Sequence, residues 1–233
     1  MIDSAATRAT RTGRADVSRT VEGTSRTSRT TALLTAGVIA GPLYVAVSLT
    51  QALTRLGFDV ARHPWSALAN GDLGWIQVAN LVLTGCLVTA FAVGLHRVLV
   101  GGRGSTWAPR LIGTYGISLV SAGMLRADPV PGFPAGTPAT TTISWHGVAH
   151  MTVGAVGFLC LTAACLLLAR RLAATSRGWA VWTAGAGIVF LAAFVGIASG
   201  AGTPATIQAF VVAVVVIWTW FSTFALRLLR STR

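Results

Sequence analysis

Charge is scarce in this chain, and lysine is absent. Only 10% of the 233 residues are charged, whereas a soluble domain carries about 25% charged residues. All 18 basic residues are arginine, the acidic residues number six, and 53% of the chain is hydrophobic. So few polar side chains cannot cover a water-facing surface, which excludes a soluble globular protein and indicates a polytopic membrane protein. The use of arginine in place of lysine also indicates an organism with an arginine-rich, lysine-poor proteome.

Cysteine is scarce as well. The three cysteines, Cys86, Cys160 and Cys165, all fall inside apolar runs, where cysteine behaves as a small hydrophobic side chain. Their number and placement imply neither a disulfide framework nor a zinc site made of thiolates. We also expect no cleavable signal peptide, because the first apolar run starts near residue 31 and is long enough to span a membrane.

Long apolar segments dominate the rest of the chain. Each has about the 20 residues that a helix needs to cross a bilayer. They lie near residues 32–53, 74–99, 108–125, 145–169, 178–199 and 205–227. The sequence therefore predicts an all-α fold, a polytopic transmembrane bundle of six helices over residues 31–229 without an inserted soluble domain. No internal repeat is evident, so the symmetry of secondary transporters is not expected.

Residues 1–30 have a different composition. They are rich in threonine, serine, alanine and arginine and contain little that could be buried in a core. Such segments are typically disordered. We therefore predict a disordered basic tail, which the orientation of the helices places in the cytoplasm.

The arginines are distributed unevenly between the connections. The tail, the second-to-third connection, the fourth-to-fifth connection and the C-terminus are rich in arginine, whereas the other connections hold only Arg55, Arg62 and Arg126. Because cytoplasmic segments carry the excess of positive charge, we predict a bacterial cytoplasmic membrane protein with both termini inside the cell (N-in, C-in). Arginines at helix ends indicate contact with membrane lipids and not with nucleic acid.

Acidic residues and histidines gather on the predicted outer side. Beyond the tail, all the acids and three of the four histidines lie in or beside the outer loops: Asp59, Asp72, Asp128, His63, His146 and His150. Gln77 and Asn80 lie near the outer end of the second helix. Because a polar group in hydrocarbon must find a partner, we predict an outward-facing polar cavity lined by Asp59, Gln77 and Asn80.

His146 and His150 are four residues apart and therefore share one face of the fourth helix. Two imidazoles at this spacing can chelate zinc, with Asp128, Asp59 or His63 as a third ligand. Such a zinc ion would lower the pKa of a bound water molecule. The alternative is that both histidines form hydrogen bonds with neighbouring helices, aided by nearby glycines.

The first outer loop contains His63-Pro64-Trp65-Ser66. Ser66 could act as a nucleophile with His63 as its base, since the two would be neighbours in a helical turn. The chain has no Gly-x-Ser-x-Gly elbow, however. The alternative is an ordered interfacial loop in which Pro64 begins a helical turn and Trp65 anchors at the headgroups.

The second outer loop is rich in proline, which predicts a stiff, extended cap. Asp128 in this loop is expected to pair with Arg126 or Arg62, or to accept a proton from a histidine.

Several short motifs recur in order at the predicted helix ends. They are Gly41-Pro42, His63-Pro64-Trp65-Ser66, Gly74-Trp75-Ile76-Gln77 with Asn80, Asp128-Pro129 with Gly132 and Pro134, and the region of His146. In these motifs the chain resembles the DUF998 family of bacterial and archaeal six-helix membrane proteins, over about residues 32–227. The resemblance implies the fold, and it implies no catalytic residue because the family's function is unknown. In residue types alone, the chain is distantly similar to zinc-dependent membrane hydrolases of the ceramidase and adiponectin-receptor type.

Two classes of function follow from these patterns. In the first, the protein is not an enzyme and binds a lipid-like ligand or a partner in its outer cavity. In the second, it is a membrane hydrolase or lyase that acts on a lipid-like substrate. The candidate catalytic residues are His63, Ser66, Asp128, His146 and His150. The candidate metal ligands are His146, His150 and Asp128, with zinc as the metal.

Overall fold

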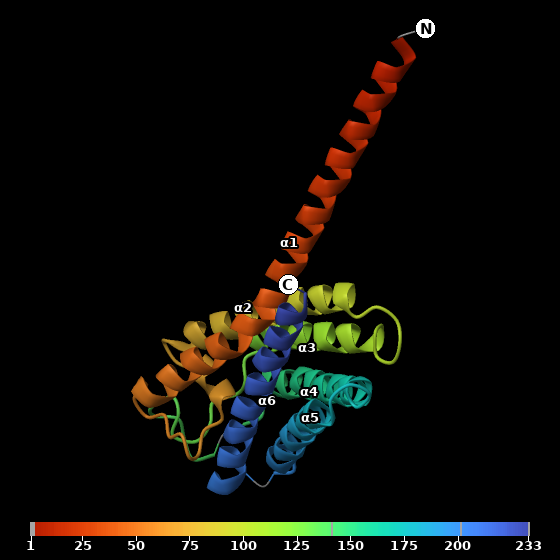
Figure 1. The fold of residues 1–233 in the computed structure, drawn as a ribbon. Coiled ribbons are helices and arrows are strands. Elements are labelled where there is room, and N and C mark those ends of the chain that lie inside the picture. The colour runs from red at the N-terminus through yellow and green to blue at the C-terminus, as the bar shows by residue number, and fades with distance from the viewer. Residues whose placement is uncertain (1–2, 141, 201, 233) are drawn as a thin grey trace.

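The computed structural model describes residues 3–140, 142–200 and 202–232, with side chains from residue 27 onward. The elements follow in the order α1 (Asp3–Thr54), η1 (Trp65–Ala69, a 3-10 helix), α2 (Gly74–Val98), α3 (Trp107–Met124), α4 (Trp145–Leu172), α5 (Arg177–Ala198) and α6 (Pro204–Ser231). The described residues also contain an isolated antiparallel β-bridge, between Val130 and Phe133. The prediction of an all-α fold with six long helices is confirmed (Figure 1).

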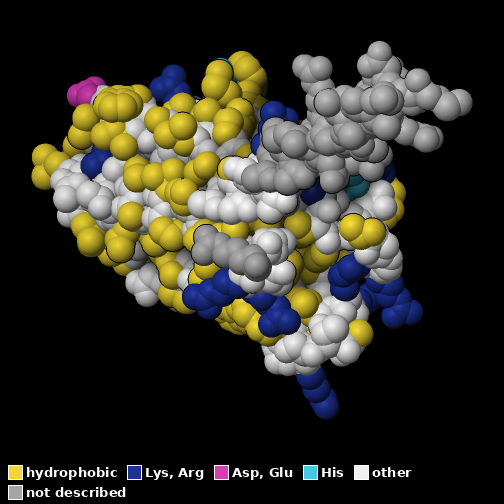
Figure 2. Space-filling model, turned by 45° about the horizontal axis from the view of Figure 1, so that its top comes forward, with side chains coloured by type: hydrophobic (Ala, Val, Ile, Leu, Met, Phe, Trp, Pro, Cys, Tyr) yellow, Lys and Arg dark blue, Asp and Glu magenta, His cyan; other side chains and the backbone are white. Residues whose placement is uncertain are grey.

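Five helical segments are long and apolar enough to cross a membrane: Thr27–Thr54 of α1, and α2, α4, α5 and α6. These segments make the chain a multi-pass membrane protein. Hydrophobic side chains cover much of the face of the bundle that Figure 2 presents, and large apolar side chains such as Leu83, Val93 and Val212 are exposed on its sides. Exposed apolar surface of this extent is suited to contact with lipid.

The helix α3 is the exception, with 18 residues. At 1.5 Å per residue it is about 27 Å long, slightly less than the hydrocarbon core of about 30 Å. Both ends of α3 nevertheless lie beside the ends of α4, which is long enough to cross the membrane. Arg171 near the end of α4 donates to the carbonyl of Gly101 before α3, and His150 near the start of α4 donates to the carbonyl of Leu125 after α3. We therefore expect α3 to cross together with its neighbours.

The six helices form a closed ring. Each helix packs against the next one in the chain, and α6 closes the ring against α1 (Figure 1). Glycines allow the close approach of neighbouring helices that is common in membrane bundles. A Cβ on Gly116 of α3 would lie 2.8 Å from the carbonyl oxygen of Gly85 on α2, and one on Gly41 of α1 would lie 2.7 Å from the carbonyl oxygen of Trp218 on α6.

The two ends of the ring differ. At the end beside the C-terminus, large buried side chains fill its centre: Leu34, Phe91, Leu95, Ile112, Phe221 and Phe224. At the other end the ring is covered by two long loops, which lie side by side (Figure 1). Their described residues are 55–73 in the first loop and 125–140 and 142–144 in the second. We refer to these two loops together as the cap.

The first helix extends beyond the ring. The N-terminal part of α1 projects away from the other helices (Figure 1), and it leaves the ring close to the predicted boundary near residue 30. An isolated helix gains no tertiary packing and is marginal in water. That residues 1–30 behave as a disordered tail therefore stays a prediction.

Candidate functional site

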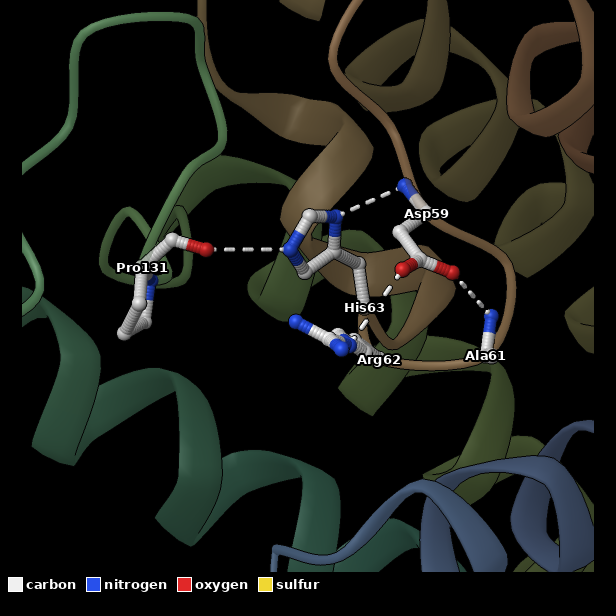
Figure 3. A network of polar contacts seen from close by, with 5 residues as sticks. All are labelled: Asp59, Ala61, Arg62, His63 and Pro131. Atoms are coloured by element: carbon white, nitrogen blue, oxygen red, sulfur yellow. Dashed lines mark hydrogen bonds and ion pairs between the residues drawn. The ribbon is translucent and has the colours of Figure 1, made fainter.

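His63 lies in the cap, and both of its ring nitrogens are used there (Figure 3). Its Nδ1 accepts a hydrogen bond of 2.9 Å from the backbone N–H of Asp59, and its Nε2 donates one of 3.0 Å to the carbonyl of Pro131. These bonds join the first loop of the cap to the second. His63 has no free lone pair left with which to act as a base for Ser66.

The carboxylate of Asp59 contacts residues of its own loop. Its carboxylate accepts a hydrogen bond from the N–H of Ala61 and lies 3.5 Å from the Nε of Arg62, on the surface of the cap (Figure 3). Asp59 is thus not among the residues that line the cavity described below.

The residues after His63 form a helical turn, as the second interpretation of this loop predicted. Pro64 directly precedes η1, and Trp65 opens it. The prediction that Trp65 anchors at the headgroups is wrong, however. Its side chain is only 5% exposed and packs against Tyr44 inside the ring, with 6.1 Å between the ring centroids.

Arg55 fixes this turn to the end of α1. Its guanidinium group donates to the carbonyls of Leu68 (2.5 Å) and Asn70 (2.6 Å) and lies over the ring of Phe133, 4.8 Å from its centroid. Burial lowers the pKa of Arg55, and the negative charge of Asp72 acts in the opposite direction. From the sequence, Arg55 was expected to contribute only to membrane orientation, and no motif indicated this role.

Asp128 caps the N-terminus of α4. Its carboxylate accepts hydrogen bonds from the backbone N–H of Ser144 (2.9 Å) and from the Ser144 hydroxyl, which in turn accepts from the N–H of Gly147. A Cβ on Gly147 would overlap the Asp128 carboxylate. A negative charge at this position also stabilises the helix dipole. The expected pairing with Arg126 or Arg62 is not found in the described residues, where Arg62 pairs with Asp59.

The two histidines of α4 have different environments. His146 is exposed, and its ring packs on that of Trp145, with 3.6 Å between the centroids. His150 is only 8% exposed, and its Nδ1 lies 3.0 Å from the carbonyl oxygen of Ala122 and 2.9 Å from that of Leu125. His150 therefore binds the end of α3, as the alternative interpretation predicted for both histidines, whereas no such hydrogen bond of His146 is found in the described residues.

The predicted zinc ligands, His146, His150 and Asp128, do not assemble. The described residues contain no group of three or more His, Cys, Asp or Glu side chains that could hold a metal ion. The physical reason is that the Asp128 carboxylate accepts hydrogen bonds at the N-terminus of α4, where backbone N–H groups lack partners. The imidazole of His150 instead donates to carbonyls at the end of α3, which also lack partners within their helix.

Gln77 and Asn80 are buried between α1 and α2. The amide of Gln51 donates to Gln77 Oε1 (2.9 Å), and the amide of Asn80 donates to Ser48 Oγ (3.1 Å) and to the carbonyl of Tyr44 (3.2 Å). Both residues thus join two helices, and neither is among the residues that line the cavity.

A cavity of about 110 Å³ lies inside the ring, beneath the cap. All six helices contribute to its walls, and Pro64, Trp65 and Ser66 cover it. Besides Trp65, the lining includes a set of aromatic side chains: Tyr44, Tyr115, Phe158, Phe190, Phe194, Phe210 and Trp218. The polar side chains Ser66, Ser118 and His150 also contribute. The cavity is therefore mainly apolar, because most of the polar side chains expected to line it are bound elsewhere.

The aromatic side chains contact one another around the cavity. Phe158 packs against Phe190 and Phe194, with 4.7 and 4.8 Å between ring centroids, and Trp218 lies between Tyr44 and Tyr115, at 5.1 and 6.0 Å. This cluster was not predicted from the sequence. The signal that could have found it is helical spacing, since residues four apart on one helix face the same side.

A wider groove of about 750 Å³ opens beside the cavity, between α4, α5 and the cap. The two hollows meet at four shared residues, Pro64, Ser66, Met151 and Phe194. Asp128 lines the groove, and no arginine is found among the described residues that line either hollow.

Comparison with known proteins gives one match. The model of a family described as a protein of unknown function, DUF998, matches residues 38–227, which include residues of all six helices. No curated protein and no solved structure matches the chain.

Proposed function

The chain belongs to the DUF998 family, whose function is unknown, and we propose that it binds a lipid-like ligand with one apolar chain in the cavity inside its ring. The observation that carries this proposal is an aromatic cavity beneath the cap that meets an open groove between α4 and α5. The groove would admit the ligand from the side, and the membrane lipids are the expected source of it.

The physical basis of selection differs from that in water. A lipid chain is already in an apolar medium, so it gains no hydrophobic free energy by entering the cavity. It gains close packing against rigid rings such as those of Phe158 and Trp218, and hydrogen bonds between its headgroup and the few polar groups of the cavity. A binding role is therefore supported better than hydrolysis. Ser66 and His150 line the same cavity, but the described residues show no hydrogen bond between them.

Filling the cavity should weaken binding by about tenfold or more. A Cβ on Gly154, which lines the cavity, would meet nothing within 4 Å, so Gly154→Leu should place its side chain in open space without disturbing α4. The ligand would then have to compete with the added methyl groups, and overpacking of about 1–3 kcal/mol corresponds to a loss of about tenfold or more. The measurement is photo-crosslinking by C12 alcohols and acids that carry a diazirine, with the protein in phosphatidylcholine nanodiscs.

The matched control for this experiment is Gly185→Leu. Gly185 also has open space at its Cβ position, and it lines neither hollow. Wild type and Gly185→Leu should be labelled on peptides that line the cavity. Labelling that is absent there in the wild type, or unchanged in Gly154→Leu, contradicts the proposal.

We also propose that the protein lies in a bacterial cytoplasmic membrane with both termini inside the cell and the cap outside. The arginine-rich connections support this orientation. In a variant without Cys86, Cys160 and Cys165, single cysteines at Ala61 and Thr137 should react with a membrane-impermeant thiol reagent on whole cells, because both lie in the cap. Cysteines at Ser105 and Thr175 should react only after the cells are opened. Labelling of either position on intact cells would refute the orientation.

A further inference from the structure

The headgroup of the ligand can be inferred from the polar atoms of the cavity, on the premise that the proposed function holds. We propose that the ligand is a long-chain alcohol or a similar neutral lipid whose hydroxyl group donates a hydrogen bond to Nε2 of His150.

The position of the hydrogen on His150 follows from its contacts. Its Nδ1 faces the carbonyl oxygens of Ala122 and Leu125, and a carbonyl oxygen can only accept a hydrogen bond. Nδ1 therefore carries the hydrogen. In the neutral ring, Nε2 then has a lone pair and acts as an acceptor.

No described residue occupies this acceptor. His150 lines the cavity, and its Nε2 forms no hydrogen bond with any described residue. Nε2 is also not fully buried. Among the fully buried side-chain nitrogen and oxygen atoms of the described residues, the one that lacks a hydrogen-bond partner is Gln51 Oε1. A ligand that offers a donor would satisfy Nε2.

A second polar group completes the recognition of a hydroxyl. Ser66 lines both the cavity and the groove, and its hydroxyl makes no hydrogen bond with a described residue, so it can donate to the ligand's oxygen. The Ser118 hydroxyl is already used, because it donates to the carbonyl of Tyr115 at 2.7 Å. A ligand hydroxyl both donates and accepts, as the pair of His150 and Ser66 requires.

The same lining disfavours an anionic headgroup. No arginine lines either hollow among the described residues, and the nearby Arg55 is held by the carbonyls of Leu68 and Asn70. The carboxylate of Asp128 lies in the groove through which an anion would enter. An unpaired charge in an apolar cavity is costly, so carboxylates and phosphates should be rejected.

The test is competition against the photoactivatable C12 alcohol in phosphatidylcholine nanodiscs at pH 8. The unlabelled competitors are 1-dodecanol, dodecyl methyl ether, dodecanoate and dodecylamine, compared at equal mole fraction in the bilayer. Because one hydrogen bond contributes about 1 kcal/mol, dodecanol should compete about 5- to 10-fold better than the ether, which has no donor. Dodecanoate should compete least.

His150→Phe tests the residue itself, because it removes the acceptor and keeps an aromatic ring. The ratio between alcohol and ether should fall to about one, and His150→Gln, which restores a carbonyl acceptor, should recover part of it. If His150→Phe does not fold, Ser66→Ala should weaken competition by dodecanol and by the ether alike, about twofold or more, because both offer an oxygen that accepts from the Ser66 hydroxyl.

The outcomes separate the inference from the proposed function. Equal competition by alcohol and ether in the wild type, or strongest competition by dodecanoate or dodecylamine, overturns the inference while leaving a chain-binding cavity. The same holds for an alcohol-to-ether ratio unchanged in a folded His150 variant, or for competition by dodecanol unchanged in Ser66→Ala. The absence of labelling in the cavity by any probe overturns the proposed function instead.

Discussion

Replacing Gly116 with alanine is expected to destabilise the bundle by about 1–3 kcal/mol, the usual cost of overpacking. The added Cβ would overlap the hydroxyl of Thr89 and would lie 2.8 Å from the carbonyl oxygen of Gly85 and 2.9 Å from the backbone nitrogen of Thr89. Two of these three atoms belong to the backbone of α2, so the clash can be relieved only by moving α3 away from α2. The measurement is thermal unfolding in one detergent, followed by circular dichroism.

Gly113 provides a control on the same helix. A Cβ there would meet only the Cβ of Ala92, at 3.7 Å, which is ordinary contact. Gly113→Ala should therefore be neutral, or stabilising by up to about 1 kcal/mol because alanine favours the helix. Equal unfolding temperatures for the two variants would mean that α2 and α3 do not approach as closely as the ring requires.

The positions of the helices could be predicted from sequence because the bilayer sets their length. The segment expected at 74–99 is α2, Gly74–Val98, and the segment expected at 178–199 is α5, Arg177–Ala198. The order of the helices around the ring could not be predicted, since hydropathy does not indicate which faces meet. The contact of Gly85 with Gly116 depends on the register of two helices, and many other glycines in the chain have open space around them.

The candidate site was predicted less well, because the free backbone groups of helix ends were left out of the prediction. The last carbonyls and the first N–H groups of a helix have no partner within it. Here His150 binds carbonyls at the end of α3, Asp128 binds the start of α4, and Arg55 binds carbonyls at the end of η1. The zinc hypothesis paired His150 with Asp128, whereas in the described residues each of them binds backbone groups at a helix end.

The residues that line the aromatic cavity are spaced regularly in the sequence, and this spacing was not used in the prediction. Phe190 and Phe194 are four residues apart on α5, and Phe210, Val214 and Trp218 continue the same spacing on α6; all five line the cavity. Sequence alone could not have separated such a face from ordinary core packing, because both have the same period. The distinction depends on how completely the opposing side chains fill the centre of the ring.

Replacing Asp128 with alanine is expected to destabilise the protein by about 1.5–3 kcal/mol, as the loss of hydrogen bonds to a charged group does. The variant leaves the N–H of Ser144 without its acceptor and separates the second loop of the cap from α4. Thermal unfolding and the rate of amide hydrogen exchange over residues 144–150 measure the effect. Asp128→Asn should give an intermediate result, because the amide keeps an acceptor and loses the charge.

The control for Asp128 is Asp72→Ala, in the other loop of the cap. Asp72 is exposed, and no hydrogen bond of its carboxylate is found in the described residues, so a change of less than about 0.5 kcal/mol is expected. Equal effects of the two variants would contradict the capping role of Asp128. If Asp128→Ala instead unfolds like the wild type and loses labelling by the C12 alcohol, the carboxylate serves the ligand and not the fold. The two roles are distinguishable because the capping bonds exist without any ligand, whereas a role in binding should leave the ligand-free transition unchanged.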